Sequence, residues 1–562
     1  MAKQDISIGT LVDKVNRGEL ILPEMQRRYV WTSTKVRDLL DSLYREYPSG
    51  SVLVWETDKV APSRNLAVEQ TESSLATRLL LLDGQQRITS LAAIISGKPV
   101  QVRNVRRPID IMFNLEHPVE LNSQATDNEG REDDDEDEGE GDDELSDIEE
   151  SIKAKTFVVY ARALEANKQW VKVTDIFTKS DRDILRGLGL TSEDERWDKY
   201  SDRIQRVRKI KDYSYVMHIL GREYEYEEVT EIFVRVNSSG VKLRGSDLAL
   251  AQITARWPGS LQLFEKFAKE CKDYHSDLDL GLLVRLLVVF ATKQSKFNTV
   301  GGLSKEQLEA AWKEAKDGCT FALDFMRQNT LFESISMLSS PFIIVPIAVI
   351  SQQRGELDQA EEAALRRWVH LAHTFGWYSH GSSETILNAD IATIWKKSGS
   401  ASDLIEQVRQ RISRLSVEVY DFEGKGKRSA LFPLAYLAVK KNGGKDWYTG
   451  LAISQNIQSN NHRIQFHHIF PRKLLREAGY EQKIINEVAN MAFIGGRTNR
   501  RISARQPYEY LEEIVAKRGE EALMSQFIPM DRALWRVEKF TDFLSERRKL
   551  LVRAANDILN QS

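Results

Sequence analysis

Apolar and polar positions alternate over short distances in the first half of the chain, which predicts a mixture of helices and strands. The predicted elements are helices over 9–17, 35–46 and 88–95 and strands over 52–55, 79–82, 157–160 and 213–220. Thr32 or Ser33 precedes the second helix and can cap its N-terminus. We therefore expect an N-terminal α+β domain over 1–245.

Between 246 and 445 the apolar residues recur three and four positions apart, which predicts a mainly helical region. Shorter elements are expected again around 466–471 and 490–499. A helix near 531–558 follows them. The predicted domains are therefore 1–245, 246–445 and 446–562.

One segment interrupts the N-terminal pattern. Residues 127–150 hold 16 acidic side chains and one arginine, a local charge of −15. Their mutual repulsion and the near absence of apolar side chains predict a disordered insert over about 122–152. Strand-like segments lie on both sides, so we expect the insert to interrupt one domain. Two roles are open for it: a solubilising loop, or a tethered mimic of DNA that occupies a basic surface.

Composition excludes collagen-like, mucin-like and wholly disordered proteins. The chain has 562 residues, 41% of them hydrophobic and 29% charged, as in ordinary globular proteins. Its longest apolar runs fall short of the roughly 20 residues that span a bilayer, and the N-terminus has no apolar signal region. Cys271 and Cys319 form neither a metal motif nor a disulfide framework. We expect a cytoplasmic protein with no membrane partner.

The distribution of charge permits a polyanionic partner. Outside 127–150 there are 78 Lys and Arg against 67 Asp and Glu, a net charge of +11. A body of this charge is compatible with binding nucleic acid, although many enzymes with no such ligand are as basic. Charge alone therefore leaves the partner open.

The first candidate site is Asp83-Gly84-Gln85-Gln86-Arg87, between an apolar strand and an amphipathic helix. The N-terminus of a helix offers unpaired N–H groups that attract phosphate, and Gly84 lets the backbone approach a ligand. Arg87 can add a bidentate contact to phosphate oxygens, and Asp83 can hold a metal ion or orient a water. The same residues can also be an Asp cap, a turn glycine and surface glutamines, so both interpretations stay open.

Two further segments accompany this site. The segment ILPEMQRRYVW contains Pro23, Gln26, Arg27, Tyr29 and Trp31, and the segment EIFVRVNSSGVKLRGSDLALA contains Asn237 and Gly240. In the order in which they follow one another along the chain, with residues 83–87 in the middle, the three segments resemble the DGQQR-motif family of bacterial proteins over about residues 5–255. That family is similar to the ParB/sulfiredoxin fold and is implicated in nucleotide binding and hydrolysis.

The resemblance implies a nucleotide, GTP or ATP, whose phosphate is surrounded by Gln26, Arg27, Asp83, Gly84, Gln85, Gln86 and Arg87, with Asn237 and Gly240 beside them. No Walker-type run is present, so such a domain would not be a P-loop enzyme.

The second candidate site begins with two adjacent histidines in RIQFHHIFPRKLL. Asn490 lies 22 residues past His468, and Asn499 lies nine residues further. This spacing is that of a hairpin followed by a helix that holds one metal ion beside a general base. One histidine can bind a divalent metal and its neighbour can activate water against a phosphodiester. Asn490 can fix the loop and the imidazole tautomer, although adjacent histidines can also be a coincidence at a strand end.

The pattern resembles the HNH (His-Me finger) nuclease family in its His-His-Ile-x-Pro form. The resemblance implies a ββα-metal fold in which His467 and Asn499 bind Mg²⁺ or Mn²⁺. It assigns the general base to His468 and the middle asparagine to Asn490. Many HNH enzymes have Asp in place of His467 and His in place of Asn499, which leaves the identity of the metal open.

Basic residues surround the second site. Residues 462–510 carry nine Lys and Arg against four Glu. The arginines nearest the proposed metal ligand are candidate contacts to the DNA backbone. They are Arg497, Arg500, Arg501 and Arg505. A solvated helix face is the alternative interpretation.

The two sites together resemble the GmrSD-type modification-dependent restriction enzymes of bacteria and the phosphorothioate-sensing nucleases of anti-phage systems. The resemblance implies an endonuclease that binds nucleotide, recognises modified phage or plasmid DNA, and nicks or cuts it with a divalent metal. The alternative is a nucleotide-regulated DNA-binding or sensor protein with a silent or RNA-directed HNH site. A homo-oligomer is left open.

Overall fold

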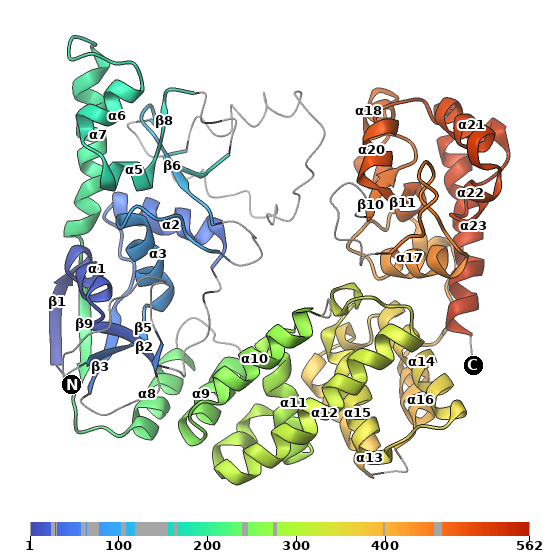
Figure 1. Cartoon of the computed structure of the whole chain (residues 1–562), viewed down its shortest axis with the longest axis horizontal. Coiled ribbons are helices and arrows are strands. Elements are labelled where there is room, and N and C mark those ends of the chain that lie inside the picture. Colours follow the sequence, from blue (N-terminus) through green and yellow to red (C-terminus); the bar gives the residue numbers. More distant parts are fainter. Residues whose placement is uncertain are drawn as a thin grey trace. The chain divides into compact units, whose positions relative to one another are not determined.

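The computed structural model divides into two compact units, Met1–Leu261 and Gln262–Ser562 (Figure 1). The residues that the structure describes are 2–23, 29, 31–57, 63–64, 78–102, 108–118, 155–161, 164, 167–238, 245–273, 278–396, 399–454 and 464–560. The predicted acidic insert over 122–152 lies outside them. The division into domains 1–245, 246–445 and 446–562 stays a prediction.

The first unit is built around a six-stranded sheet of mixed direction, in the order β1-β9-β3-β5-β2-β4. Its strands are β1 (Ala2–Ser7), β2 (Leu20–Pro23), β3 (Val52–Thr57), β4 (Ser63–Arg64), β5 (Arg78–Asp83) and β9 (Ser214–Leu220). Because β2 and β5 run parallel, their carboxyl ends lie at the same edge of the sheet. The first candidate site begins at this edge.

Helices cover both faces of this sheet (Figure 1). They are α1 (Ile8–Asn16), α2 (Ser33–Tyr44), α3 (Gln85–Ile95), α8 (Tyr226–Ser238) and α9 (Gly245–Arg256). The first three share a buried cluster with strand residues such as Val54 and Leu81. Residues of α8 and α9 share a second cluster with Trp55 and Leu80. Adjacent strand residues face opposite sides, so the sheet separates two apolar layers, and the predicted α+β character is confirmed.

A smaller sheet of order β7-β6-β8 contains the strands on either side of the acidic insert. Its strands are β6 (Ile111–Asn114), β7 (Phe157–Val159) and β8 (Trp170–Lys172), and the helices α5 (Val173–Thr178), α6 (Asp181–Gly187) and α7 (Arg196–Arg208) follow them. β6 pairs antiparallel with β7, with Phe113 opposite Phe157. The chain before and after the insert therefore belongs to one sheet.

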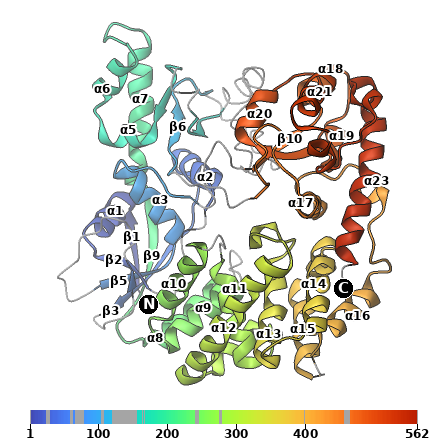
Figure 2. The same ribbon diagram turned by 45° about the vertical axis from the view of Figure 1, so that its right-hand side comes forward.

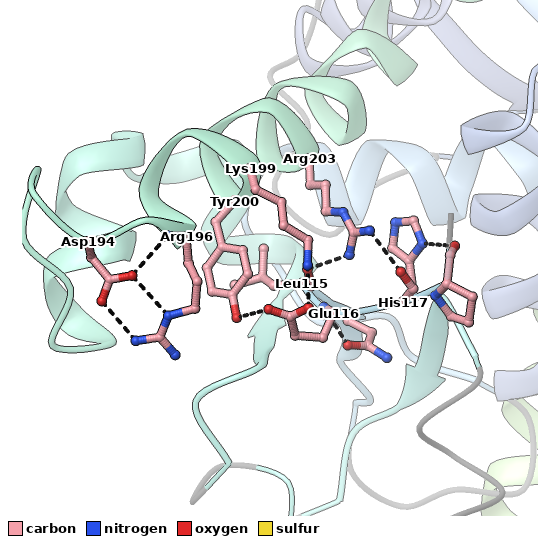
Figure 3. Close-up of polar contacts among 10 residues, drawn as sticks. Leu115, Glu116, His117, Asp194, Arg196, Lys199, Tyr200 and Arg203 are labelled. Atoms are coloured by element: carbon pink, nitrogen blue, oxygen red, sulfur yellow. Dashed lines mark hydrogen bonds and ion pairs between the residues drawn. The ribbon is translucent and has the colours of Figure 1, made fainter. Parts of the chain in front are cut away.

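The loop after β6 is fastened to α7 by charged side chains (Figure 3). The Glu116 carboxylate accepts a hydrogen bond from the Tyr200 hydroxyl at 2.5 Å and pairs with Lys199 Nζ at 2.5 Å. Arg203 donates to two carbonyls of the same loop at 2.5 and 2.8 Å. The described residues that precede the insert are thus bound to α7.

The second unit is mainly helical up to residue 441, as the spacing of its apolar residues predicted. These helices are α10 (Ser260–Asp273, which begins just before the unit), α11 (Leu280–Thr292), α12 (Lys305–Asn329), α13 (Ile344–Arg354), α14 (Gln359–Thr374), α15 (Ser383–Lys396), α16 (Ala401–Arg411) and α17 (Leu431–Lys441). Leu283 and Leu287 of α11 are fully buried. Burial of these apolar stripes supplies the core of the unit.

Mostly short elements and one helix of 20 residues follow α17. They are β10 (Ile464–His468), α18 (Arg472–Glu477), α19 (Gln482–Ile485), β11 (Met491–Gly495), α20 (Gly496–Ile502), α21 (Pro507–Arg518), α22 (Glu521–Met524) and α23 (Phe540–Leu559). Figure 2 shows α17 and α23 flanking the part of the unit that contains β10.

The last helix was predicted to begin near 531, and that boundary is wrong. Residues 532–535 and 537–539 form two 3-10 turns before α23. Asp531 caps the first turn by accepting from Ala533 N at 3.0 Å, and the buried Trp535 indole donates to Pro529 O at 2.8 Å. These local bonds hold the segment in turns, so the α-helix starts at Phe540.

Candidate active site

The second candidate site lies on a hairpin and the short helix that follows it. β10 and β11 pair antiparallel, with His467 opposite Ala492 and His468 opposite Met491. α20 begins directly after β11, with Gly495 as its N-cap. Since neighbouring strand residues face opposite sides, the two histidines point to different faces of the hairpin.

His467 faces α20, where its Nδ1 lies 2.7 Å from Asn499 Oδ1. The imidazole is 5% exposed and lies edge-on to the rings of Trp447 and Tyr510, with centroids 6.3 and 6.0 Å away. Burial lowers the pKa of His467 to about 4, so the ring is neutral at pH 7. Within the described part of the chain its Nε2 has no hydrogen-bond partner.

His468 makes a hydrogen bond on the other face, from its Nε2 to Asn486 Oδ1 at 3.1 Å. Burial first, and the positive charge of Arg472 second, lower the pKa of His468 to about 3. Sequence reasoning missed Asn486, which lies in the loop after α19 and belongs to none of the recognised motif positions. Only the folded chain brings it to the imidazole.

Asn490 is fully buried and binds backbone groups with its whole amide. Its Oδ1 accepts from Phe470 N at 2.9 Å, and its Nδ2 donates to Phe470 O at 3.2 Å and to Ile485 O at 3.0 Å. These three bonds tie the turn after His468 to the end of α19. Asn490 thus supports the loop that carries the histidine.

A buried aspartate that sequence reasoning missed positions α20. Asp446 is 4% exposed, accepts from Gly495 N at 2.7 Å and from the Thr498 hydroxyl at 2.7 Å, and so holds the start of the helix that carries Asn499. Burial would raise the pKa of Asp446, but hydrogen bonds from Thr449, Thr498 and Gly495 outweigh it and lower that pKa. About fifty residues separate Asp446 from this helix, so no local pattern in the sequence signals the contact.

The four predicted DNA-contacting arginines lie on α20 and just beyond it. Arg497, Arg500 and Arg501 are exposed residues of the helix, and Arg505 follows it. Arg501 and Arg505 pair with Glu513 of α21 at 2.9 and 2.8 Å. The surface beside Asn499 is therefore basic, and part of its charge is compensated.

The first candidate site begins where β5 ends at Asp83. Gly84 is the N-cap of α3, with φ +96, a conformation that glycine adopts without strain. Arg87, one turn into the helix, donates to Ser49 O at 2.5 Å and to Ser51 O at 2.7 Å, and lies 3.4 Å from Asp83 Oδ2. The guanidinium thus holds the loop before β3 against the start of α3.

Two of the three motif segments meet at α3. Gln86 Oε1 accepts from Trp31 N at 3.2 Å, and the hydroxyls of Tyr29 and Ser90 lie 2.6 Å apart. Gln85 is buried at the start of the same helix.

The structure describes one of the remaining predicted nucleotide-binding residues. Gln26, Arg27 and Gly240 lie outside the described residues. Asn237 belongs to α8, whose Phe233 packs on the opposite face of the sheet from α3, in the cluster with Leu80.

Two features of the described residues bear on the chemistry. In the described ranges, no group of three or more His, Cys, Asp or Glu side chains is arranged to hold a metal ion. No helix in the same ranges is long and apolar enough to cross a membrane.

Residues 8–254 match the family model described as the N-terminal domain of the GmrSD restriction endonuclease. This match covers nearly the whole first unit, supports a GmrSD-type N-terminal domain and suggests a restriction-type nuclease. The chain is also similar to an uncharacterised protein of Methanocaldococcus jannaschii, with 23% identity over 98% of this chain and 93% of that protein. The second similarity extends through the second unit.

We expect Asn490→Ala to destabilise the second unit. The change removes partners from three buried backbone groups, and each unsatisfied buried group costs about 1–3 kcal/mol. The free energy of unfolding, measured by urea denaturation, should therefore fall by about 3 kcal/mol or more.

The matched control is Asn442→Ala, in which the exposed amide loses two longer bonds of 3.3 Å at the end of α17. Equal free energies of unfolding for Asn490→Ala and Asn442→Ala would contradict the supporting role of Asn490.

Proposed function

We propose that this protein is a modification-dependent DNA endonuclease of the HNH type, acting in defence against phage and regulated by nucleotide in its first unit. The observation that carries the proposal is the approach of His467 and Asn499 across a hairpin and helix, with His468 as the next residue along the strand. The similarity of residues 8–254 to a restriction endonuclease domain supports it.

The pair His467 and Asn499 is suited to a divalent metal such as Mg²⁺ or Mn²⁺. An amide oxygen and the unprotonated nitrogen of a neutral imidazole are both metal donors, and burial keeps His467 neutral at pH 7. To bind a metal together with Asn499, Nδ1 of His467 would give up the proton that it donates to Asn499 Oδ1 in the free protein. Mg²⁺ is commonly held by one or two carboxylates and completes its shell with water and phosphate, and here an imidazole and an amide would stand in place of the carboxylates. When bound, such a metal stabilises the negative charge that develops on a phosphodiester during hydrolysis.

His468 is the proposed general base. If its Nε2 carries the proton that is donated to Asn486 Oδ1, its Nδ1 keeps the lone pair that accepts a proton from water. A nearby phosphate would raise the pKa of His468, because a negative charge favours the imidazolium. Asn486 and Asn490 hold the ring and its loop in place.

The DGQQR segment is the proposed site for GTP or ATP. The N-terminus of α3 presents backbone N–H groups at the sheet edge, beside Asp83 and Gly84. Arg87 already binds two carbonyls, so its proposed part is to shape the loop around a nucleotide phosphate and to contribute its positive charge. The resemblance adds Gln26, Arg27 and Gly240, which lie outside the described residues, and Asn237 of α8, a helix that packs on the opposite face of the sheet from α3.

One observation favours the alternative of a DNA-binding sensor with a silent HNH site. His467 is 5% exposed between the rings of Trp447 and Tyr510, which restricts access to its ring nitrogens. Such a protein would bind modified DNA and nucleotide without cutting, and the cleavage assay below separates it from the nuclease.

We expect His468→Ala to abolish metal-dependent plasmid nicking, because loss of a general base typically lowers the rate about 10²–10⁴-fold. The assay uses Mg²⁺ or Mn²⁺ and plasmids that are unmodified, phosphorothioated or hydroxymethylated. The matched control is His380→Ala, an exposed histidine of the same unit whose Nε2 lies 2.8 Å from Phe375 O. Unchanged cleavage by His468→Ala would rule out this base, and no cleavage by the wild type would favour the sensor.

Arg87→Gln should weaken NTP binding by about 10-fold or more, because the loop loses the guanidinium that holds Ser49 O and Ser51 O and the site loses a positive charge. Calorimetric titration with GTP and with ATP measures the change. Arg222→Gln is the control, since this exposed arginine of the same unit pairs with Glu56 away from α3. Equal NTP affinity in Arg87→Gln and the wild type would remove the phosphate role from Arg87.

A further inference from the structure

Three cations converge on one carboxylate beside the helix that carries Asn499. Glu513 Oε1 lies 2.9 Å from Arg501 Nη2 and 2.5 Å from Lys517 Nζ, and its Oε2 lies 2.8 Å from Arg505 Nη1. One negative charge therefore faces three positive charges. The four side chains together keep a net charge of +2, whereas a simple ion pair would be neutral.

The carboxylate lies deeper than the cations around it. The side chain of Glu513 is 24% exposed, whereas those of Arg501, Lys517 and Arg505 are 52%, 48% and 37% exposed. The cationic groups therefore border solvent, where a second anion can reach them. Exposed ion pairs contribute little to stability one by one, so a competing phosphate can displace the carboxylate from them.

An aromatic ring holds two of these cations without neutralising them. The Arg501 guanidinium carbon lies 4.1 Å from the centre of the Tyr448 ring, and Lys517 Nζ lies 5.5 Å from it. A cation over an aromatic face is attracted by the ring but keeps its full charge for another ligand. Tyr448 thus keeps both side chains in place on the surface.

Both helices of the cluster are fixed to the candidate metal site. Arg501 lies two residues after Asn499 on α20. Glu513 and Lys517 lie on α21, whose Tyr510 donates from its hydroxyl to Ile469 O at 2.6 Å and packs edge-on to His467. The cluster therefore keeps a constant position relative to His467 and Asn499.

We propose that Arg501, Arg505 and Lys517 form a cradle for a DNA backbone phosphate, in which the Glu513 carboxylate pairs with the three cations in the free protein and competes with the phosphate for them. The inference rests on the proposed nuclease function, because DNA is the polyanion that the neighbouring site would cut. A carboxylate and a phosphate oxygen pair accept the same bidentate and point-charge contacts from Arg and Lys. Lys517 is a DNA contact that the arginine pattern alone did not include.

The test measures binding of a short unmodified DNA duplex by the full chain in EDTA, across a series of salt concentrations. Glu513→Gln removes the competing carboxylate, so affinity at low salt should rise about 3- to 30-fold and the salt dependence should steepen. Lys517→Gln should weaken binding about 3- to 10-fold and reduce the slope of log K against log salt by about 0.9.

Glu512→Gln is the matched control. It removes the same charge from the adjacent residue of α21, but Glu512 pairs with Arg532 at 3.3 Å and lies outside the cradle. Affinity that rises equally in Glu512→Gln and Glu513→Gln would reflect net charge only and would overturn the proposal. An increase confined to an RNA duplex of the same sequence would overturn the assignment to DNA.

The experiments test the proposed phosphate cradle and the proposed nuclease activity separately. Tighter DNA binding by Glu513→Gln, with no nicking by the wild type, would support the cradle and remove the nuclease. Nicking that depends on His468, with equal DNA affinities in Glu513→Gln and Glu512→Gln, would keep the nuclease and remove the cradle.

Discussion

A two-stranded hairpin and a seven-residue helix cannot be stable alone, and this constraint governs the structure around His467 and Asn499. Buried polar side chains from distant segments supply the missing partners. The Gln526 amide bonds both backbone groups of Phe493 in β11 at 2.8 Å, and Arg547 of α23 donates to Ala489 O at 2.9 Å. The elements around the hairpin therefore hold His467 and Asn499 in place, which the hairpin and the short helix could not do by themselves.

This dependence on distant segments also explains how much of the structure could be predicted from the sequence. The mixed first unit, the helical region and the chain elements around the two histidines follow from local periodicity and turn chemistry. Asp446 and Asn486 were missed because their contacts depend on segments that are brought together only in the folded chain. Arg87 shows the same limit, since its charge and position suggest a phosphate contact while its donors bind Ser49 O and Ser51 O, 38 and 36 residues earlier.

The two sites use positive charge in different ways. In the first unit the Arg87 guanidinium is enclosed by backbone carbonyls and organises a loop. In the second unit Arg501 and its neighbours lie at the surface around a single carboxylate, and the nearby histidines are kept neutral by burial. The second site thus places neutral imidazoles in a buried centre and positive charge at the surface beside it.

The most direct test of this account is Mn²⁺ binding, measured by electron paramagnetic resonance with a short DNA duplex present and a DNA-only sample as the blank. We expect one protein-dependent Mn²⁺ site in the wild type and in the control His380→Ala, and loss of that site in both His467→Ala and Asn499→Ala. Undiminished Mn²⁺ binding by His467→Ala and Asn499→Ala would show that these residues do not hold the metal.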